Sequence, residues 1–99
     1  MAQKQVVWSH GASQEFESIL EFYIERNKSN AYSFKLLSTV DQLIKLVQEN
    51  NAIGRLSDDH ITRILSFETF LLFYQISDQT IEIMSVWDNR QNPINRLDA

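Results

Sequence analysis

The stretch Phe70-Leu71-Leu72-Phe73-Tyr74-Gln75-Ile76 is almost continuously apolar and aromatic. A strand with one face in water alternates between apolar and polar residues, whereas a strand covered on both faces does not need to. Residues 70–76 are therefore expected to form a central strand of a sheet. The polar run Ser77-Asp78-Gln79 is expected to end it.

The segments on either side of this strand repeat with a period of two, which is typical of further strands. Residues 61–67 come before it and residues 80–87 come after it, so the last two strands should form a hairpin. The alternation in the second segment predicts one face made of Ile81, Ile83, Ser85 and Trp87 and another made of Glu82, Met84 and Val86.

Two helices are predicted ahead of these strands. Apolar residues recur at spacings of three and four over residues 10–26, directly after Ser9, whose hydroxyl can cap a helix. A second periodic stretch follows the polar break at 27–30 and should end near Asn50-Asn51. The short break predicts two antiparallel helices.

The remaining segments complete an α+β chain of the order β-α-α-β-β-β. Residues 4–8 are prone to form a strand, 53–59 are expected to be a loop, and 89–99 form a polar tail containing Pro93. We expect the two antiparallel helices to pack on a mainly antiparallel four-stranded sheet. A chain of 99 residues has room for one hydrophobic core, so we expect a single domain over 1–99 with its core at about 4–88.

Composition narrows the classes of function. The absence of cysteine excludes disulfides, zinc-thiolate sites, iron-sulfur clusters and cysteine nucleophiles. The first residues do not resemble a secretion signal, and no apolar run approaches the ~20 residues needed to span a bilayer. We therefore expect a cytoplasmic protein without a membrane partner. The net charge of −4 is unfavourable for binding nucleic acid over a broad basic face.

Three segments carry a resemblance to a known family. They are Val7-Trp8-Ser9 before an acidic helix, Arg63-Ile64-Leu65 leading into 70–74, and the closing Trp87-Asp88-Asn89-Arg90-Gln91-Asn92-Pro93. Together they resemble the RelE/ParE superfamily of plasmid-stabilisation toxins over residues 6–93. The resemblance implies the toxin of a type II toxin-antitoxin pair, neutralised by a cognate antitoxin. Its members either cleave messenger RNA on the ribosome or poison DNA gyrase, and a fold alone does not choose between them.

The resemblance nominates a few residues for chemistry. Arg63 and Arg90 match positions where nuclease members carry catalytic arginines, and Arg55 and Tyr74 are weaker candidates for substrate binding. A guanidinium can hold a phosphate or a carboxylate through two parallel hydrogen bonds, so Arg63 and Arg90 could instead be structural, paired with Glu68, Asp88 or the backbone. Tyr74 could equally be a core residue. A local positive patch could still form from Arg55, Arg63, Arg90 and Arg96.

Other features weigh against nuclease chemistry. Residues 50–67 contain no lysine, and the tail after Trp87 contains neither tyrosine nor histidine, so the usual acid and several usual cations are missing. This favours a ParE-like, non-nucleolytic toxin. The alternatives are a metal-independent endoribonuclease that uses Arg63 and Arg90, and an attenuated toxin that only binds its antitoxin. No cofactor or metal is expected, because the adjacent Asp58, Asp59 and His60 cannot all face one ion.

The second helix carries a broad apolar arc that one packing surface would not need. It could receive the antitoxin, or it could be buried between the first helix and the sheet. The arc consists of Leu36, Val40, Leu43, Leu46 and Val47.

Overall fold

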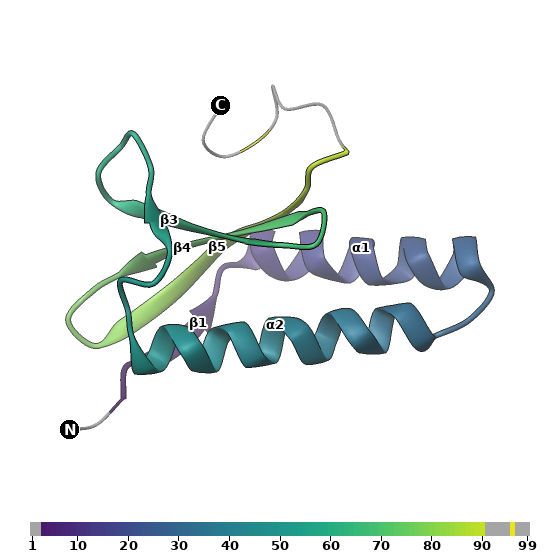
Figure 1. Ribbon diagram of the computed structural model, residues 1–99, viewed down its shortest axis with the longest axis horizontal. Helices are drawn as coiled ribbons and strands as arrows, with labels where there is room; N and C mark the ends of the chain where they lie inside the picture. Colours follow the sequence, from purple (N-terminus) through teal and green to yellow (C-terminus); the bar gives the residue numbers. More distant parts are fainter. Residues whose placement is uncertain (1–2, 91–95, 97–99) are drawn as a thin grey trace.

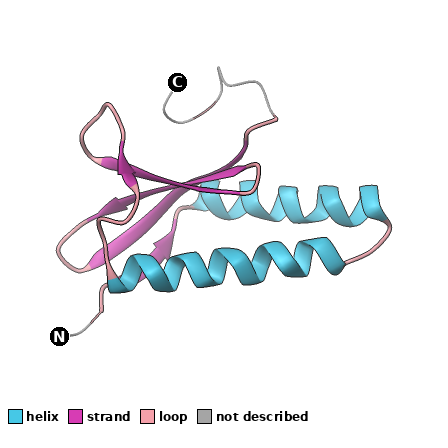
Figure 2. Ribbon diagram, viewed as in Figure 1, coloured by secondary structure: helices cyan, strands magenta, loops and turns pink. Residues whose placement is uncertain are grey.

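The computed structural model describes residues 3–90 and 96, and in it two helices lie side by side on one face of a five-stranded sheet (Figures 1 and 2). The predicted α+β class and the order of the main elements are confirmed. The elements are β1 (Gln5–Trp8), α1 (His10–Asn27), α2 (Ala31–Glu49), β2 (Arg55–Leu56), β3 (Thr62–Phe67), β4 (Phe70–Ile76) and β5 (Thr80–Asp88).

The strands are arranged in the order β1-β5-β4-β3-β2, so β4 is central as its apolar run predicts. All neighbours are antiparallel except β1, which pairs in parallel with β5. The expectation of four strands was wrong by one. Arg55 and Leu56, placed in a loop, pair with Ile64 and Arg63 as the edge strand β2. A strand of two residues is too short to show a period.

Each helix has one apolar face, and α1 also has a capped start. The backbone N–H of Ala12 donates to Ser9 Oγ at 3.0 Å, as expected of an N-cap. Ser33 Oγ donates to the carbonyl of Leu20 at 2.7 Å and joins the two helices. Neither helix of the described chain is both long and apolar enough to cross a membrane.

A β-bulge in β5 corrects the predicted faces of that strand. Phe73 pairs with Ser85 and Tyr74 pairs with Ile83, so Met84 is an extra residue. One inserted residue exchanges the two faces of everything beyond it. Val86 therefore joins Ile81 and Ile83 in the core beneath the helices. Trp87 lies instead with Ile64, Leu71 and Phe73 in a second apolar cluster.

Candidate functional site

Arg63 is held by the loop that follows α2. Its Nη1 donates to the carbonyl of Gly54 at 2.8 Å and to that of Ala52 at 3.3 Å. The guanidinium thus satisfies carbonyl groups just beyond the helix end, which have no helical partner of their own. This arrangement matches the structural alternative for Arg63, in which it pairs with the backbone.

Tyr74 holds the same loop from the central strand. Its hydroxyl donates to the carbonyl of Asn51 at 2.8 Å and accepts from the N–H of Gly54 at 2.9 Å. The side chain is fully buried, and burial raises the pKa of the Tyr74 phenol above its ordinary value. A hydroxyl with both partners filled inside the core is not available to a substrate in this conformation.

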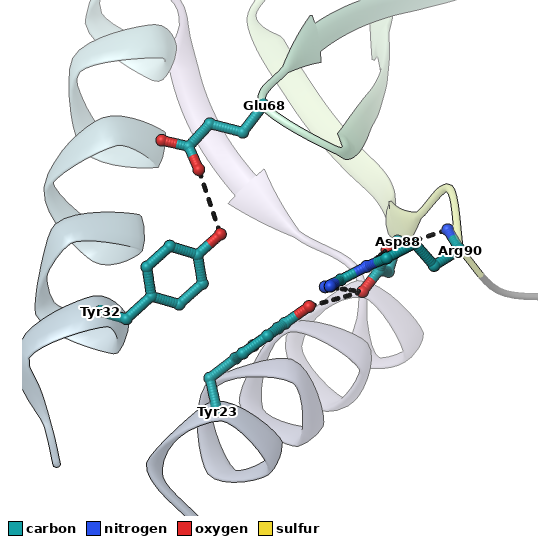
Figure 3. Close-up of polar contacts among 5 residues, drawn as sticks. All are labelled: Tyr23, Tyr32, Glu68, Asp88 and Arg90. Atoms are coloured by element: carbon teal, nitrogen blue, oxygen red, sulfur yellow. Dashed lines mark hydrogen bonds and ion pairs between the residues drawn. The ribbon is translucent and has the colours of Figure 1, made fainter. Parts of the chain in front are cut away.

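Arg90 belongs to a second cluster at the opposite end of the sheet, where Figure 3 shows Arg90 lying across the Tyr23 ring. Its Nε and Nη2 donate to the two carboxylate oxygens of Asp88 at 3.0 and 2.8 Å. Tyr23 Oη donates to Asp88 Oδ2 at 3.0 Å, and Arg90 Cζ lies 5.0 Å from the centroid of the Tyr23 ring. Arg90 thus forms an ion pair with Asp88, which is the partner expected if Arg90 has a structural role.

The structure does not bring Arg63 and Arg90 together. Arg63 pairs with Tyr74, which pairs with Ile83 near the middle of β5. Arg90 lies beyond Asp88, so roughly 16 Å of strand separates the two positions, at ~3.3 Å per residue. The third arginine, Arg55, is exposed on the edge strand β2, next to β3. Arg63 and Arg90 therefore lie in two separate parts of the described chain.

The acidic turn before β3 has a structural explanation. Asp59 Oδ1 accepts from the N–H groups of Ile61 and Thr62, both at 2.8 Å, and the hydroxyls of Ser57 and Thr62 donate to its carboxylate at 2.7 Å. These hydrogen bonds, led by that from Ser57, lower the pKa of Asp59 well below its usual range. Within residues 3–90 and 96, no group of three or more potential ligands is placed to hold a metal ion.

A groove lies between α1 and the end of β5. It has a volume of about 1010 Å³. The residues that line it include Arg90, Asp88 and Tyr23. The exposed ring of Phe22 and the side chain of Ile19 supply apolar surface from α1. We call this feature the α1–β5 groove. Its remaining lining includes Gly11, Gln14, Glu15, Ser18 and Arg26 from α1, and Met84, Ser85 and Val86 from β5.

The family model of the ParE toxin of type II toxin-antitoxin system, parDE, matches residues 6–93. The chain belongs to this family. No curated protein sequence is significantly similar to it.

Two solved structures share the fold of this ParE-family chain. A structure described as the chromosomal ParDE TA system from P. aeruginosa has a TM-score of 0.71 at 19% identity. The YoeB dimer from Staphylococcus aureus has a TM-score of 0.61 at 18% identity. Each likeness covers 85% of this chain and 94% of the other chain. At these identities the likeness concerns the fold alone.

The segments that carried the resemblance fall at structural junctions of this ParE-family chain. Val7-Trp8-Ser9 ends β1 and caps α1, while Arg63-Ile64-Leu65 lies in β3. Trp87-Asp88 closes β5, and the Asp88–Arg90 pair fixes the turn after it. Gln91, Asn92 and Pro93 lie outside the described residues.

The apolar arc of α2 does not form one surface. Leu36, Val40 and Val47 are buried in the core between the helices and the sheet, and Leu43 is half-buried against that core. Only Leu46, which is 44% exposed, reaches the surface. The apolar stripe that predicts the helix is therefore its core-facing side. This agrees with the alternative prediction, in which the arc is buried between α1 and the sheet. For Leu36, Val40 and Val47, a direct antitoxin contact would require the core to open.

The hydrogen bonds from tyrosines to carboxylates, which connect the helices to the sheet, were not predicted from the sequence. Tyr32 Oη donates to Glu68 Oε2 at 3.1 Å (Figure 3), and Lys35 Nζ lies 3.0 Å from Glu68 Oε1. Hydrogen bonds from Lys35 and then Tyr32 lower the pKa of Glu68. The pKa of Tyr32 is raised, first by burial and second by its hydrogen bond to Glu68. From the sequence, Glu68 is a candidate partner only for an arginine, and no local pattern links residues so far apart.

Proposed function

We propose that this ParE-family toxin stops growth by binding and poisoning DNA gyrase, without cleaving RNA, in the cytoplasm of its host. A cognate antitoxin neutralises it. The proposal rests chiefly on one observation: both arginines that match the nuclease pattern are already engaged by groups of the chain itself.

Cleavage of RNA by its own 2′-hydroxyl needs a base, an acid for the leaving oxygen, and cations for the charge that develops on phosphate. Arg63 and Arg90 are about a strand length apart, and the hydroxyl of Tyr74 has both partners filled. The loop and strand at 50–67 supply no lysine, and 88–99 supply no tyrosine or histidine. A protein that inhibits by binding needs none of these groups.

An antitoxin has apolar surface to cover on the helices. The exposed side chains include Phe22 on α1 and, on α2, Phe34, Leu37 and Leu46. Exposed apolar groups of this size on neighbouring helices favour a protein partner. The charged side chains between them keep the free toxin in solution.

The test is a brief induction of the full chain in cells without antitoxin, with two readouts on the same culture. We expect a reporter plasmid to lose negative supercoils and the SOS response to rise, while primer extension finds intact messenger RNA. Purified toxin should likewise inhibit supercoiling by purified gyrase. The matched variant is Arg63→Ala with Arg90→Ala, checked for folding by circular dichroism.

Discrete RNA cleavage products that disappear in the folded double variant, with supercoiling unchanged, would overturn the proposal in favour of the endoribonuclease. Normal growth with both readouts unchanged would overturn it in favour of an attenuated toxin that only binds its antitoxin.

A further inference from the structure

Two arginines stand at one end of the α1–β5 groove with N–H donors to spare. Arg26 is exposed and forms no ion pair within residues 3–90 and 96. Arg90 holds Asp88 through Nε and Nη2, whereas its Nη1 donates to no residue of the described chain. Its side chain is 48% exposed. Unused guanidinium donors that line one groove favour an anion.

The two guanidinium groups are close to each other because both are neighbours of Tyr23. Arg90 Cζ lies 5.0 Å from the centroid of the Tyr23 ring, and Figure 3 shows the guanidinium against this ring. Arg26 follows Tyr23 by three residues on α1, a spacing that makes side chains neighbours on a helix surface. Tyr23 and Asp88 also fix the orientation of Arg90, which lowers the entropy lost when a ligand binds.

An exposed aromatic ring lies next to this pair of cations. Phe22 is 52% exposed in the groove, and its ring contacts Tyr23 edge to face, with 5.0 Å between the ring centroids. Arg26 follows Phe22 by four residues, and side chains of a helix lean toward its N-terminus, so Arg26 extends toward Phe22. An exposed ring of this kind can stack with a planar ligand whatever the sequence around it. The groove therefore offers stacking and anion binding side by side.

The other end of the groove is polar and carries the opposite charge. Ser18 and Gln14 are exposed there, and their hydroxyl and amide groups can each donate and accept hydrogen bonds. Glu15 stands about 16 Å from Arg26 along the helix, at ~1.5 Å per residue. Its carboxylate repels an anionic group, so a ligand with one anionic end can bind in only one direction.

We infer that the α1–β5 groove binds a free nucleoside monophosphate. The phosphate lies between Arg26 and Arg90, the base stacks on Phe22, and the polar edge of the base faces Ser18 and Gln14. A volume of about 1010 Å³ is ample for base, sugar and phosphate together, whereas a single aromatic ring with a carboxylate would fill little of it. This ligand does not depend on gyrase as the target of the toxin.

The first test is calorimetric titration of the full chain with adenosine 5′-monophosphate, and the comparison ligand is adenosine. Adenosine lacks the phosphate and should bind at least about tenfold more weakly, because it makes no charge-assisted hydrogen bond to either arginine. Nuclear magnetic resonance spectra of the same titration should show the largest amide shifts at Ser18, Phe22 and Arg26.

The second test uses exposed positions, so that the variants keep the fold. Arg26→Gln should weaken binding of the monophosphate about five- to tenfold, and Phe22→Ala about tenfold. The matched controls are Arg55→Gln and Phe34→Ala, which make related changes at exposed residues outside the groove lining. Each control should change the dissociation constant less than about twofold.

Three results would overturn the inference: no binding of the monophosphate, equal affinity for monophosphate and adenosine, or equal losses in Arg26→Gln and Arg55→Gln. A single-stranded oligonucleotide that binds more tightly than the monophosphate would also overturn it, and would assign the groove to a nucleic-acid strand. None of these measurements involves gyrase or an antitoxin, so the inference and the proposed function can fail separately.

Discussion

Tyr74 fixes the loop after α2 through a single hydroxyl that bonds to Asn51 and Gly54. The change Tyr74→Phe leaves a buried N–H and a carbonyl without this partner, and an unsatisfied buried polar group costs about 1–3 kcal/mol. We expect the free energy of unfolding, measured by urea denaturation, to fall by about that amount. Inhibition of growth should persist at matched levels of folded toxin, because the hydroxyl touches only the chain itself.

Gly54→Ala is the companion variant. A Cβ at this position would lie 2.9 Å from both Cε1 and Oη of Tyr74, and 3.1 Å from the carbonyl oxygen of Ile64. The ring must therefore move, and the variant should also be destabilised. In the variant that combines Tyr74→Phe with Gly54→Ala, the hydroxyl is absent and cannot collide with the new Cβ. The loss in free energy of unfolding of this double variant should therefore be smaller than the sum of the losses of the two single variants. Strict additivity would contradict this account of the loop.

Asp88 joins the helix α1 to the end of β5. Its carboxylate accepts from Tyr23 and from two nitrogens of Arg90, and Asp88→Asn leaves one acceptor oxygen where there were two. We expect the free energy of unfolding to fall by about 1–2 kcal/mol, since charge-assisted hydrogen bonds are the stronger kind. The control is Asp78→Asn, an exposed position in the β4–β5 turn that loses the same charge. Equal stability of the two variants would refute the role given to Asp88.

The sequence located the two matching arginines and named Asp88 and the backbone among their candidate partners, but it could not choose between these partners and a phosphate. A planar guanidinium fits a phosphate, a carboxylate or a pair of carbonyls equally well. The carbonyl of Gly54 and the carboxylate of Asp88 become the nearest acceptors of Arg63 and Arg90 only once strands and loops have assembled. The structural roles of Tyr23 and Tyr32 had no local signal, because their acidic partners come from the far end of the sequence.

The turn between β2 and β3 depends on the ionised form of Asp59. Its pKa is lowered in the folded chain, so its stabilising effect is fully present above the unfolded pKa of about 4, begins to decline below that value, and is lost completely only as pH falls through the lower folded pKa. Hydrogen exchange at Ile61 and Thr62, corrected for intrinsic rates, should therefore show less protection at about pH 3 than at about pH 7. Asp59→Ala should show lower protection than the wild type at about pH 7 and a smaller difference between the two pH values. Equal protection of the wild type at both pH values would argue against the turn.

Helices and strands that are long enough to repeat their apolar pattern several times were predictable from the sequence. Short or irregular elements were not. Both helices and the run at 70–76 carry a repeated signal, because burial of one face or two selects residues at every turn or pleat. The two-residue strand β2 has no room for a repeat, and the bulge at Met84 changes the faces of β5 without any break in composition. This bulge determines that Val86 and Asp88 face the helices, so the groove depends on it.

The assembled molecule has a feature that belongs to no single element. The α1–β5 groove arises because β1 is shorter than β5 and because α1 starts directly after β1, so the helix runs beside the uncovered half of the strand. Periodicity gives the helix and the strand but not their relative lengths in the sheet. The layers of the fold could therefore be predicted from the sequence, whereas the groove required the register.

The net charge of the whole chain leads to a prediction that separates the two modes of toxicity. With a charge of −4 and exposed glutamates along α1, the toxin should bind a single-stranded RNA oligonucleotide weakly, with little change between about 50 and about 200 mM salt. Fluorescence anisotropy measures this. Replacing Glu17, Glu21 and Glu25 by lysine should create salt-sensitive binding, because each change adds two units of positive charge on one helix. Tight, strongly salt-dependent binding by the wild type would instead reveal a local basic patch and would favour an RNA target over gyrase.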